Sequence, residues 1–137
     1  MEALRNKVVD RLKAAGVTPT QQRVEIAQIL FREHQHLSAE QVLSEVNQNG
    51  TVASKATIYN TLGLFAEKGL VREVIVDPTK VFYDSNVSDH HHFYNVDTGN
   101  LTDIDPNAVQ VANLPPLPEG TVADGVDVII RLRQSDI

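Results

Sequence analysis

Apolar residues recur every three or four positions along residues 54–68, a spacing that predicts one amphipathic helix. Its buried stripe has four members: Ile58, Leu62, Phe65 and Ala66. Ser54 is a favoured N-cap residue, and Gly69 lies where a left-handed residue commonly ends a helix. The outward positions near the start carry donors, acceptors and one aromatic ring, which suit contacts to phosphates and base edges. We therefore predict a recognition helix with five DNA-contact residues: Ser54, Lys55, Thr57, Tyr59 and Asn60.

After this helix the pattern changes from helical to alternating. Residues 70–76 and 81–84 are rich in β-branched and aromatic types, and the turn sequence of residues 77–80 separates them. This pattern predicts a β-hairpin, and a recognition helix followed by a hairpin is the arrangement of a winged helix. We predict a winged helix-turn-helix domain over residues 1–84.

Three further helices are predicted upstream. Residues 2–15 form the first, with a stripe of apolar side chains. Thr18 is the predicted N-cap of the second, because Pro19 suits the first helical position and Gln21 completes a capping box. Residues 38–41 repeat the capping-box pattern and open the third helix.

The second half of the chain predicts a small sheet. Residues 90–96 and 101–104 flank a turn sequence and read as a hairpin, and residues 126–133 have the strongest β pattern in the chain. Four prolines between residues 105 and 120 exclude a long helix there. A three-stranded sheet is marginal alone, so we expect a second copy of the chain to pack against it.

Composition narrows the chemistry. The 137 residues contain no cysteine, which excludes disulfides and thiolate ligands and leaves nitrogen and oxygen to bind a metal. No apolar run reaches the length of a membrane span, and the start lacks a signal-peptide pattern, so a soluble cytoplasmic protein is expected. The net charge of −6 lies wholly in residues 85–137, and the first 84 residues are neutral, which is compatible with DNA binding.

Three consecutive histidines are the main candidate for a ligand site. Strand alternation places His90 and His92 on one face and His91 on the other. If Thr98-Gly99 forms the hairpin tip, Asp103 pairs with Tyr94 and shares the face of His90 and His92. His36 and Asp84 of the first half add a further nitrogen and a further carboxylate. We therefore predict a site for Zn²⁺, Fe²⁺ or Mn²⁺ at His36, Asp84, His90, His92 and Asp103.

A single histidine is more often a solvated or core residue than a ligand. The run of three favours metal or haem, because adjacent imidazoles on a strand pack no better than apolar residues. Lys55 and Arg23 could likewise be ordinary charged residues on a solvated helix face, without a role in DNA binding. Tyr59 could be an ordinary, partly buried aromatic.

Several of these segments together resemble the ferric uptake regulator family of bacterial metal-dependent transcription factors. The segments that carry the resemblance are residues 19–23, 36–40, 54–62, 69–71, and the histidine run followed by Thr98-Gly99 and Asp103. The histidine run, the absence of cysteine and residues 126–133 are similar to the iron response regulator branch of that family, which senses haem or haem synthesis.

The resemblance implies a homodimer with an α+β fold: an N-terminal winged helix-turn-helix and a small C-terminal α/β dimerisation and ligand-sensing domain over residues 85–137. The family's interdomain metal site maps onto the five residues proposed above, and its DNA contacts map onto the Tyr59 helix and, more loosely, onto Arg23. Its haem-responsive run maps onto His90, His91 and His92.

This chain departs from the family in three ways: it lacks the paired CxxC motifs, the cysteine-containing haem motif, and an uninterrupted sequence for the long helix of the second domain, where Pro115, Pro116 and Pro118 intervene.

The predicted function is a dimeric regulator of iron and haem homeostasis that binds a double-stranded DNA operator and responds to a divalent metal or haem. No membrane association is expected. The alternatives are a peroxide sensor or another metal-responsive repressor of the same family, and a small non-haem iron enzyme. The last is disfavoured because no acid, base or nucleophile accompanies the histidines, so we predict that the protein is not an enzyme.

Overall fold

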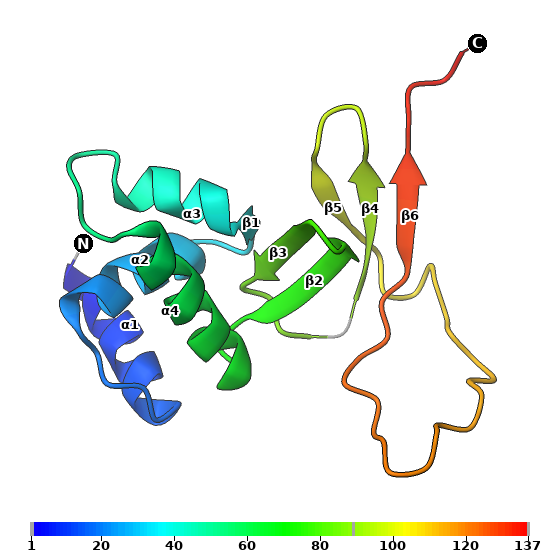
Figure 1. Cartoon of the computed structure of the whole chain (residues 1–137), viewed down its shortest axis with the longest axis horizontal. Helices are drawn as coiled ribbons and strands as arrows, with labels where there is room; N and C mark the ends of the chain where they lie inside the picture. The colour runs from blue at the N-terminus through cyan, green and yellow to red at the C-terminus, as the bar shows by residue number, and fades with distance from the viewer. Residues whose placement is uncertain (1, 89, 137) are drawn as a thin grey trace. The chain divides into compact units, whose positions relative to one another are not determined.

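The computed structural model describes residues 2–88 and 90–136 and divides the chain into two compact units, Met1–Val87 and Ser88–Ile137 (Figure 1). The predicted boundary, after Asp84, lies three residues before this division. The assignment of DNA binding to one unit and of dimerisation and sensing to the other stays a prediction.

The first unit contains four helices and a three-stranded sheet. Its elements are α1 (Glu2–Ala14), α2 (Gln21–Phe31), β1 (His36–Ser38), α3 (Ala39–Val46), α4 (Lys55–Glu67), β2 (Arg72–Asp77) and β3 (Lys80–Asp84). The strands pair antiparallel in the order β1-β3-β2, so the predicted hairpin is confirmed. Helix α4 followed directly by this hairpin is a winged helix.

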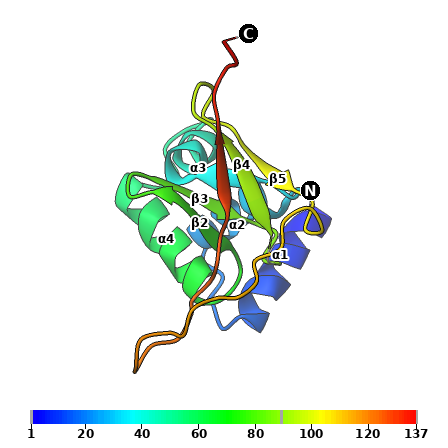
Figure 2. The ribbon, with the colours of Figure 1, turned by 90° about the vertical axis from the view of Figure 1, so that its right-hand side faces the viewer.

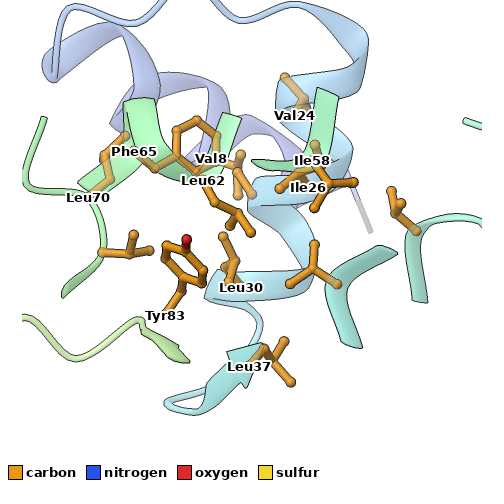
Figure 3. Close-up of a cluster of buried hydrophobic side chains, with 14 of the residues drawn as sticks. Val8, Val24, Ile26, Leu30, Leu37, Ile58, Leu62, Phe65, Leu70 and Tyr83 are labelled. Carbon is orange, nitrogen blue, oxygen red and sulfur yellow. The ribbon is translucent and has the colours of Figure 1, made fainter. Parts of the chain in front are cut away.

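One hydrophobic core holds the helices of this unit together (Figure 3). Ile58, Leu62 and Phe65 of α4 have no exposed surface, and Leu30 of α2 and Val8 of α1 are buried with them. Burial of a Leu, Ile or Phe side chain contributes about 1.5–3 kcal/mol. The predicted stripe of α4 is therefore confirmed, and it determines which side of the helix faces outward.

The predicted ends of α4 are also confirmed. The Ser54 hydroxyl accepts the backbone N–H of Thr57 at 3.2 Å, as an N-cap does. Gly69 has a φ of +75°, which suits glycine because it lacks a Cβ. The N–H groups of Gly69 and Leu70 bond to the carbonyls of Ala66 (3.1 Å) and Phe65 (2.9 Å), the two bonds of a Schellman motif.

The predicted start of the second helix was wrong. Thr20, and not Thr18, is the N-cap of α2, and its side chain accepts the N–H of Arg23 at 3.3 Å. Val17 is buried and its N–H bonds to the Leu12 carbonyl at 2.8 Å, and the Thr20 N–H bonds to the Thr18 carbonyl at 3.0 Å, so a tight turn at residues 18–20 precedes the helix. The capping box of α3 between Ser38 and Gln41 is confirmed.

Strand β1 was not predicted. Its three residues are too few to show an alternating pattern, and it exists because it pairs with β3, with His36 opposite Asp84 and Leu37 opposite Tyr83. This pairing adds a third strand to the wing and brings two predicted metal ligands to the same position in the sheet.

The second unit is a sheet of three strands: β4 (His91–Asn95), β5 (Leu101–Ile104) and β6 (Ile129–Leu132). Strand β4 lies between the other two, antiparallel to β5 and parallel to β6, which is red in Figure 1 and Figure 2. The predicted third strand is confirmed over four of its eight residues. The α+β class is confirmed, but residues 88 and 90–136 contain no helix, because prolines interrupt the segment where the family resemblance implied one.

The predicted register of this hairpin was wrong by two residues. Asp103 pairs with His92, and Leu101 pairs with Tyr94. Five residues, 96–100, connect the two strands, and the Asn95 side chain accepts the N–H groups of Asp97 (2.9 Å) and Thr98 (3.1 Å). A two-residue tip would require a positive φ at Thr98, which a β-branched residue resists. A two-residue shift preserves strand parity, so Asp103 still shares a face with His92.

The second unit has little core of its own. Among residues 88 and 90–136, the buried apolar side chains are Tyr94, Leu101 and Ile104, whereas residues 110–127 are exposed. Over the described residues, no helix combines the length and the apolar character needed to cross a bilayer.

Candidate metal ligands and DNA-binding helix

The start of α4 presents most of the predicted DNA contacts at the surface. Lys55, Tyr59 and Asn60 are exposed, as is Ser54. Thr57 is half-buried, and its hydroxyl lies 3.0 Å from that of Ser54. The helix N-terminus also carries a partial positive charge. The stripe of buried residues thus leaves a polar, electropositive end of α4 exposed.

Arg23 lies at the start of α2, which is tied to the loop before α4. Gln22 donates a hydrogen bond from Nε2 to the Val52 carbonyl at 2.9 Å, and this bond links the two helix starts. Arg23 is half-buried, and its Nη1 donates to the Thr18 carbonyl at 3.0 Å. A guanidinium has five donor hydrogens, so this bond leaves donors for a phosphate.

Tyr59 has a partner that the sequence did not predict. The Tyr59 hydroxyl donates a hydrogen bond to Oε1 of Glu40, on α3, at 2.6 Å. This bond raises the pKa of Tyr59 and is the main reason why the pKa of Glu40 is lowered. Glu40 is nineteen residues away in sequence and exposed, so no local pattern marks it.

Two predicted metal ligands, His36 and Asp84, belong to the first unit. They are opposite each other in the pairing of β1 with β3, with His36 Nε2 3.7 Å from Asp84 Oδ2. Asp84 is 1% exposed. Its other oxygen, Oδ1, accepts the N–H of Asn86 at 2.8 Å. A carboxylate this buried is stable only where hydrogen bonds or positive charge compensate it.

The other three, His90, His92 and Asp103, belong to the second unit. Oδ1 of Asp103 lies 3.2 Å from His90 Nε2 and 3.4 Å from His92 Nε2. The two imidazole rings are 4.5 Å apart, and His90 and His92 are buried. Because a carboxylate accepts and does not donate, these short contacts require a proton on the imidazoles or a cation among the three groups.

The Nδ1 atoms of His90 and His91 have different roles. His90 Nδ1 lies 2.7 Å from the Ser88 carbonyl, which only accepts, so Nδ1 carries the proton and Nε2 faces Asp103. His91 Nδ1 accepts the N–H of Val128 at 2.9 Å, so its proton lies on Nε2 when the ring is neutral. A carbonyl that holds Nδ1–H and leaves Nε2 for the metal is a common arrangement for a histidine ligand.

His91 does not belong to the group formed by His90, His92 and Asp103. Its Nδ1 accepts the backbone N–H of Val128, just before β6, a bond that the sequence did not predict. The three imidazoles therefore divide into a clustered pair and one separate residue.

These features define a winged-helix protein that carries clustered imidazole and carboxylate groups suited to a divalent metal. The family comparison agrees with this class. The model of the ferric uptake regulator family matches residues 14–114, and the chain belongs to this family.

Curated relatives include the peroxide-responsive repressor PerR of Staphylococcus aureus, 32% identical over 92 residues. The match covers 67% of this chain and 62% of that repressor. The ferric uptake regulators of Vibrio cholerae (TM-score 0.70, 22% identity, 92% of this chain and 98% of that one) and Pseudomonas aeruginosa (0.68, 24%, 93% and 97%) share the fold. These findings show the family but do not assign the chain to the iron response regulator branch.

We predict that in the metal-free protein Nδ1 of His90 carries a proton and Nδ1 of His91 does not. Long-range ¹H–¹⁵N spectra at neutral to mildly alkaline pH should show protonated Nδ1 in His90 and protonated Nε2 in His91, because each Nδ1 has a fixed backbone partner. The same protonation state of Nδ1 in both rings would contradict these two hydrogen bonds.

Proposed function

We propose that this chain is a homodimeric, metal-responsive transcription regulator that binds double-stranded DNA through α4. The observation that carries the proposal is that the polar start of α4 is exposed in a chain of this family with a winged-helix fold. Lys55, Tyr59 and Asn60 supply charge, a ring and an amide there. Asn is a common partner for adenine in the major groove, and Lys for phosphate.

Homodimer formation is supported by the composition of the second unit. Its sheet buries three apolar side chains and ends in β5 and β6, and Ile130 and Leu132 of β6 are 39% and 38% exposed. Small sheets with exposed apolar residues at an edge are stabilised by association. Two copies would provide two recognition helices for successive major grooves, about 34 Å apart.

We further propose that His36, Asp84, His90, His92 and Asp103 share one divalent cation. Each unit alone offers only two or three ligands, whereas Zn²⁺, Fe²⁺ and Mn²⁺ take four to six. Five linker residues keep the Cα atoms of Asp84 and His90 within about 20 Å of each other, so a common site is within reach of the chain. The set contains nitrogen and oxygen only, which suits these metals.

The solved relatives support the choice of metal. The structures from Pseudomonas aeruginosa and Francisella tularensis are ferric uptake regulators with manganese and with iron, and another relative is a zinc-bound manganese uptake regulator. A cation held by both units would limit their relative motion, and the spacing of the two recognition helices in a dimer would then depend on metal occupancy.

Two effectors are consistent with this site. The S. aureus relatives are peroxide-responsive repressors, which supports oxidation of a histidine bound to Fe²⁺. The histidine run supports haem, as in the iron response regulator branch, and His91 is the separate histidine whose Nε2 is not used by Val128.

The DNA-binding surface can be tested with two lysine variants of α4. Lys55→Ala should weaken binding to a duplex selected from a random library by the Mn²⁺-loaded wild type. It should also reduce the slope of log K against log[salt] by about 1 per bound monomer, because one phosphate contact is lost. Fluorescence anisotropy at several salt concentrations measures both quantities.

Lys68→Ala is the matched control, because it removes the same charge from the C-terminal end of the same helix. It should leave affinity and slope close to the wild-type values. Equal effects of the two variants would show that net charge, and not the start of α4, decides DNA binding.

The metal site can be tested with Asp103→Asn. The amide keeps the shape of Asp103 but removes the charge between two imidazoles, so Mn²⁺ affinity should fall about 10–100-fold in isothermal titration calorimetry. Asp105→Asn makes the same change at an exposed residue just beyond β5 and should bind Mn²⁺ like the wild type. Unchanged Mn²⁺ affinity in Asp103→Asn would refute the assigned ligand set.

The effector can be identified in one comparison. With peroxide after Fe²⁺ loading, the peroxide-sensing function predicts one added oxygen on a histidine peptide, detected by mass spectrometry, and loss of duplex binding. The haem-sensing function predicts no such oxidation, a shift of the haemin Soret band that His91→Ala abolishes, and loss of duplex binding on haemin addition. Haem binding with unchanged DNA affinity would refute haem sensing.

A further inference from the structure

Glu40 is an unexpected residue for the predicted DNA-binding surface. Its carboxylate accepts the hydroxyl hydrogen of Tyr59 at 2.6 Å, a length typical of a hydrogen bond to a charged acceptor. Lys55 and Lys80 also lower the pKa of Glu40, so the carboxylate lies in a positive field. A negative charge at this place repels phosphates, which suggests that it has another purpose.

The bond restricts what Tyr59 can do. A phenol has one hydrogen to donate, and Glu40 holds it. Phosphate oxygens only accept, so Tyr59 could donate to a phosphate only by giving up Glu40. Tyr59 is 41% exposed, and Lys55 Nζ lies 5.9 Å from the centroid of its ring. While the bond to Glu40 persists, the ring is the part of Tyr59 that remains available to DNA.

We propose that Glu40 is a positioning residue that fixes the ring of Tyr59, so that Tyr59 contacts DNA through its ring and not through its hydroxyl, while the Glu40 charge discourages non-specific phosphate binding. The proposal rests on the proposed function of α4. It makes the contact of Tyr59 apolar, and the thymine methyl group is the apolar feature of the major groove. Glu40 then favours specificity over raw affinity.

Two variants of Glu40 separate its charge from its hydrogen bond. Glu40→Gln removes the charge but keeps an oxygen that can accept from Tyr59, and Glu40→Ala removes both. Both should bind a random-sequence duplex more tightly than the wild type, because one negative charge is lost per monomer. Glu40→Ala should bind the selected duplex about fivefold more weakly than Glu40→Gln does, because the ring of Tyr59 is no longer fixed in Glu40→Ala.

Tyr59→Phe tests the role of the hydroxyl. It keeps the ring and breaks the same hydrogen bond, so it should lower the preference for the selected duplex over the random one. The size of this loss should be about the same as the difference in preference between Glu40→Gln and Glu40→Ala. The double variant Glu40→Ala with Tyr59→Phe should show no further loss of preference, because both changes remove one interaction. Additive losses, or a loss in Tyr59→Phe with none in Glu40→Ala, would show that the hydroxyl contacts DNA and would overturn the proposal.

A second measurement does not need DNA. In protein with ¹³C-labelled tyrosine Cζ, the Tyr59 resonance, assigned by its absence in Tyr59→Phe, should move in Glu40→Ala and much less in Glu40→Gln. Thermal melts confirm that each variant is folded. If the wild type selects no duplex, the proposed function fails and this inference with it; if the wild type binds and the Glu40 variants equal it, only this inference fails.

Discussion

Burial of one side of α4 is the constraint on which the first unit depends. Ile58, Leu62 and Phe65 have no exposed surface, and they pack with residues of α1 and α2 in a single core. A helix that buries one stripe must expose the opposite one. Its caps, Ser54 and the Schellman motif at Gly69, fix where the helix starts and ends. The polar start of α4 is therefore exposed as a consequence of packing, and the proposed DNA contacts follow from that geometry.

A second constraint acts on the buried polar groups. Asp84, His90 and His92 are each at most 4% exposed, and burial of ionisable groups is costly unless they are paired or bind a metal. Partners come from sheet pairing: His36 is opposite Asp84, and Asp103 is opposite His92. In each unit, strand register thus brings together residues that we propose as metal ligands. The proposed shared cation would compensate both groups at once, which links metal binding to the freedom of the two units.

Glu40 links two helices at the proposed DNA surface. It lies in the first turn of α3, between the two residues of the capping box, and its carboxylate accepts the hydroxyl hydrogen of Tyr59 of α4. A contact between two helices therefore holds the hydroxyl of a residue at the proposed DNA surface. If a carboxylate there were only a cost, phosphate repulsion would be its sole effect. In the role that we propose, its hydrogen bond positions Tyr59 and its charge serves discrimination between sequences.

The amino-acid sequence by itself determined the elements whose signals are local: the stripe and caps of α4, the capping box of α3, the turn of the wing, and the strand parity that groups His90 with His92. The absence of cysteine also limited any metal site to nitrogen and oxygen ligands. Only the tertiary structure decided three other features. Strand β1 exists through its pairing with β3, which joins residues far apart in the chain, and no local spacing encodes such a pairing. The helix start at Thr20 and the Asn95 loop depend on bonds between near neighbours, but Thr18 and Thr20 both suit an N-cap and both hairpin registers keep the same strand parity, so the local pattern did not distinguish them.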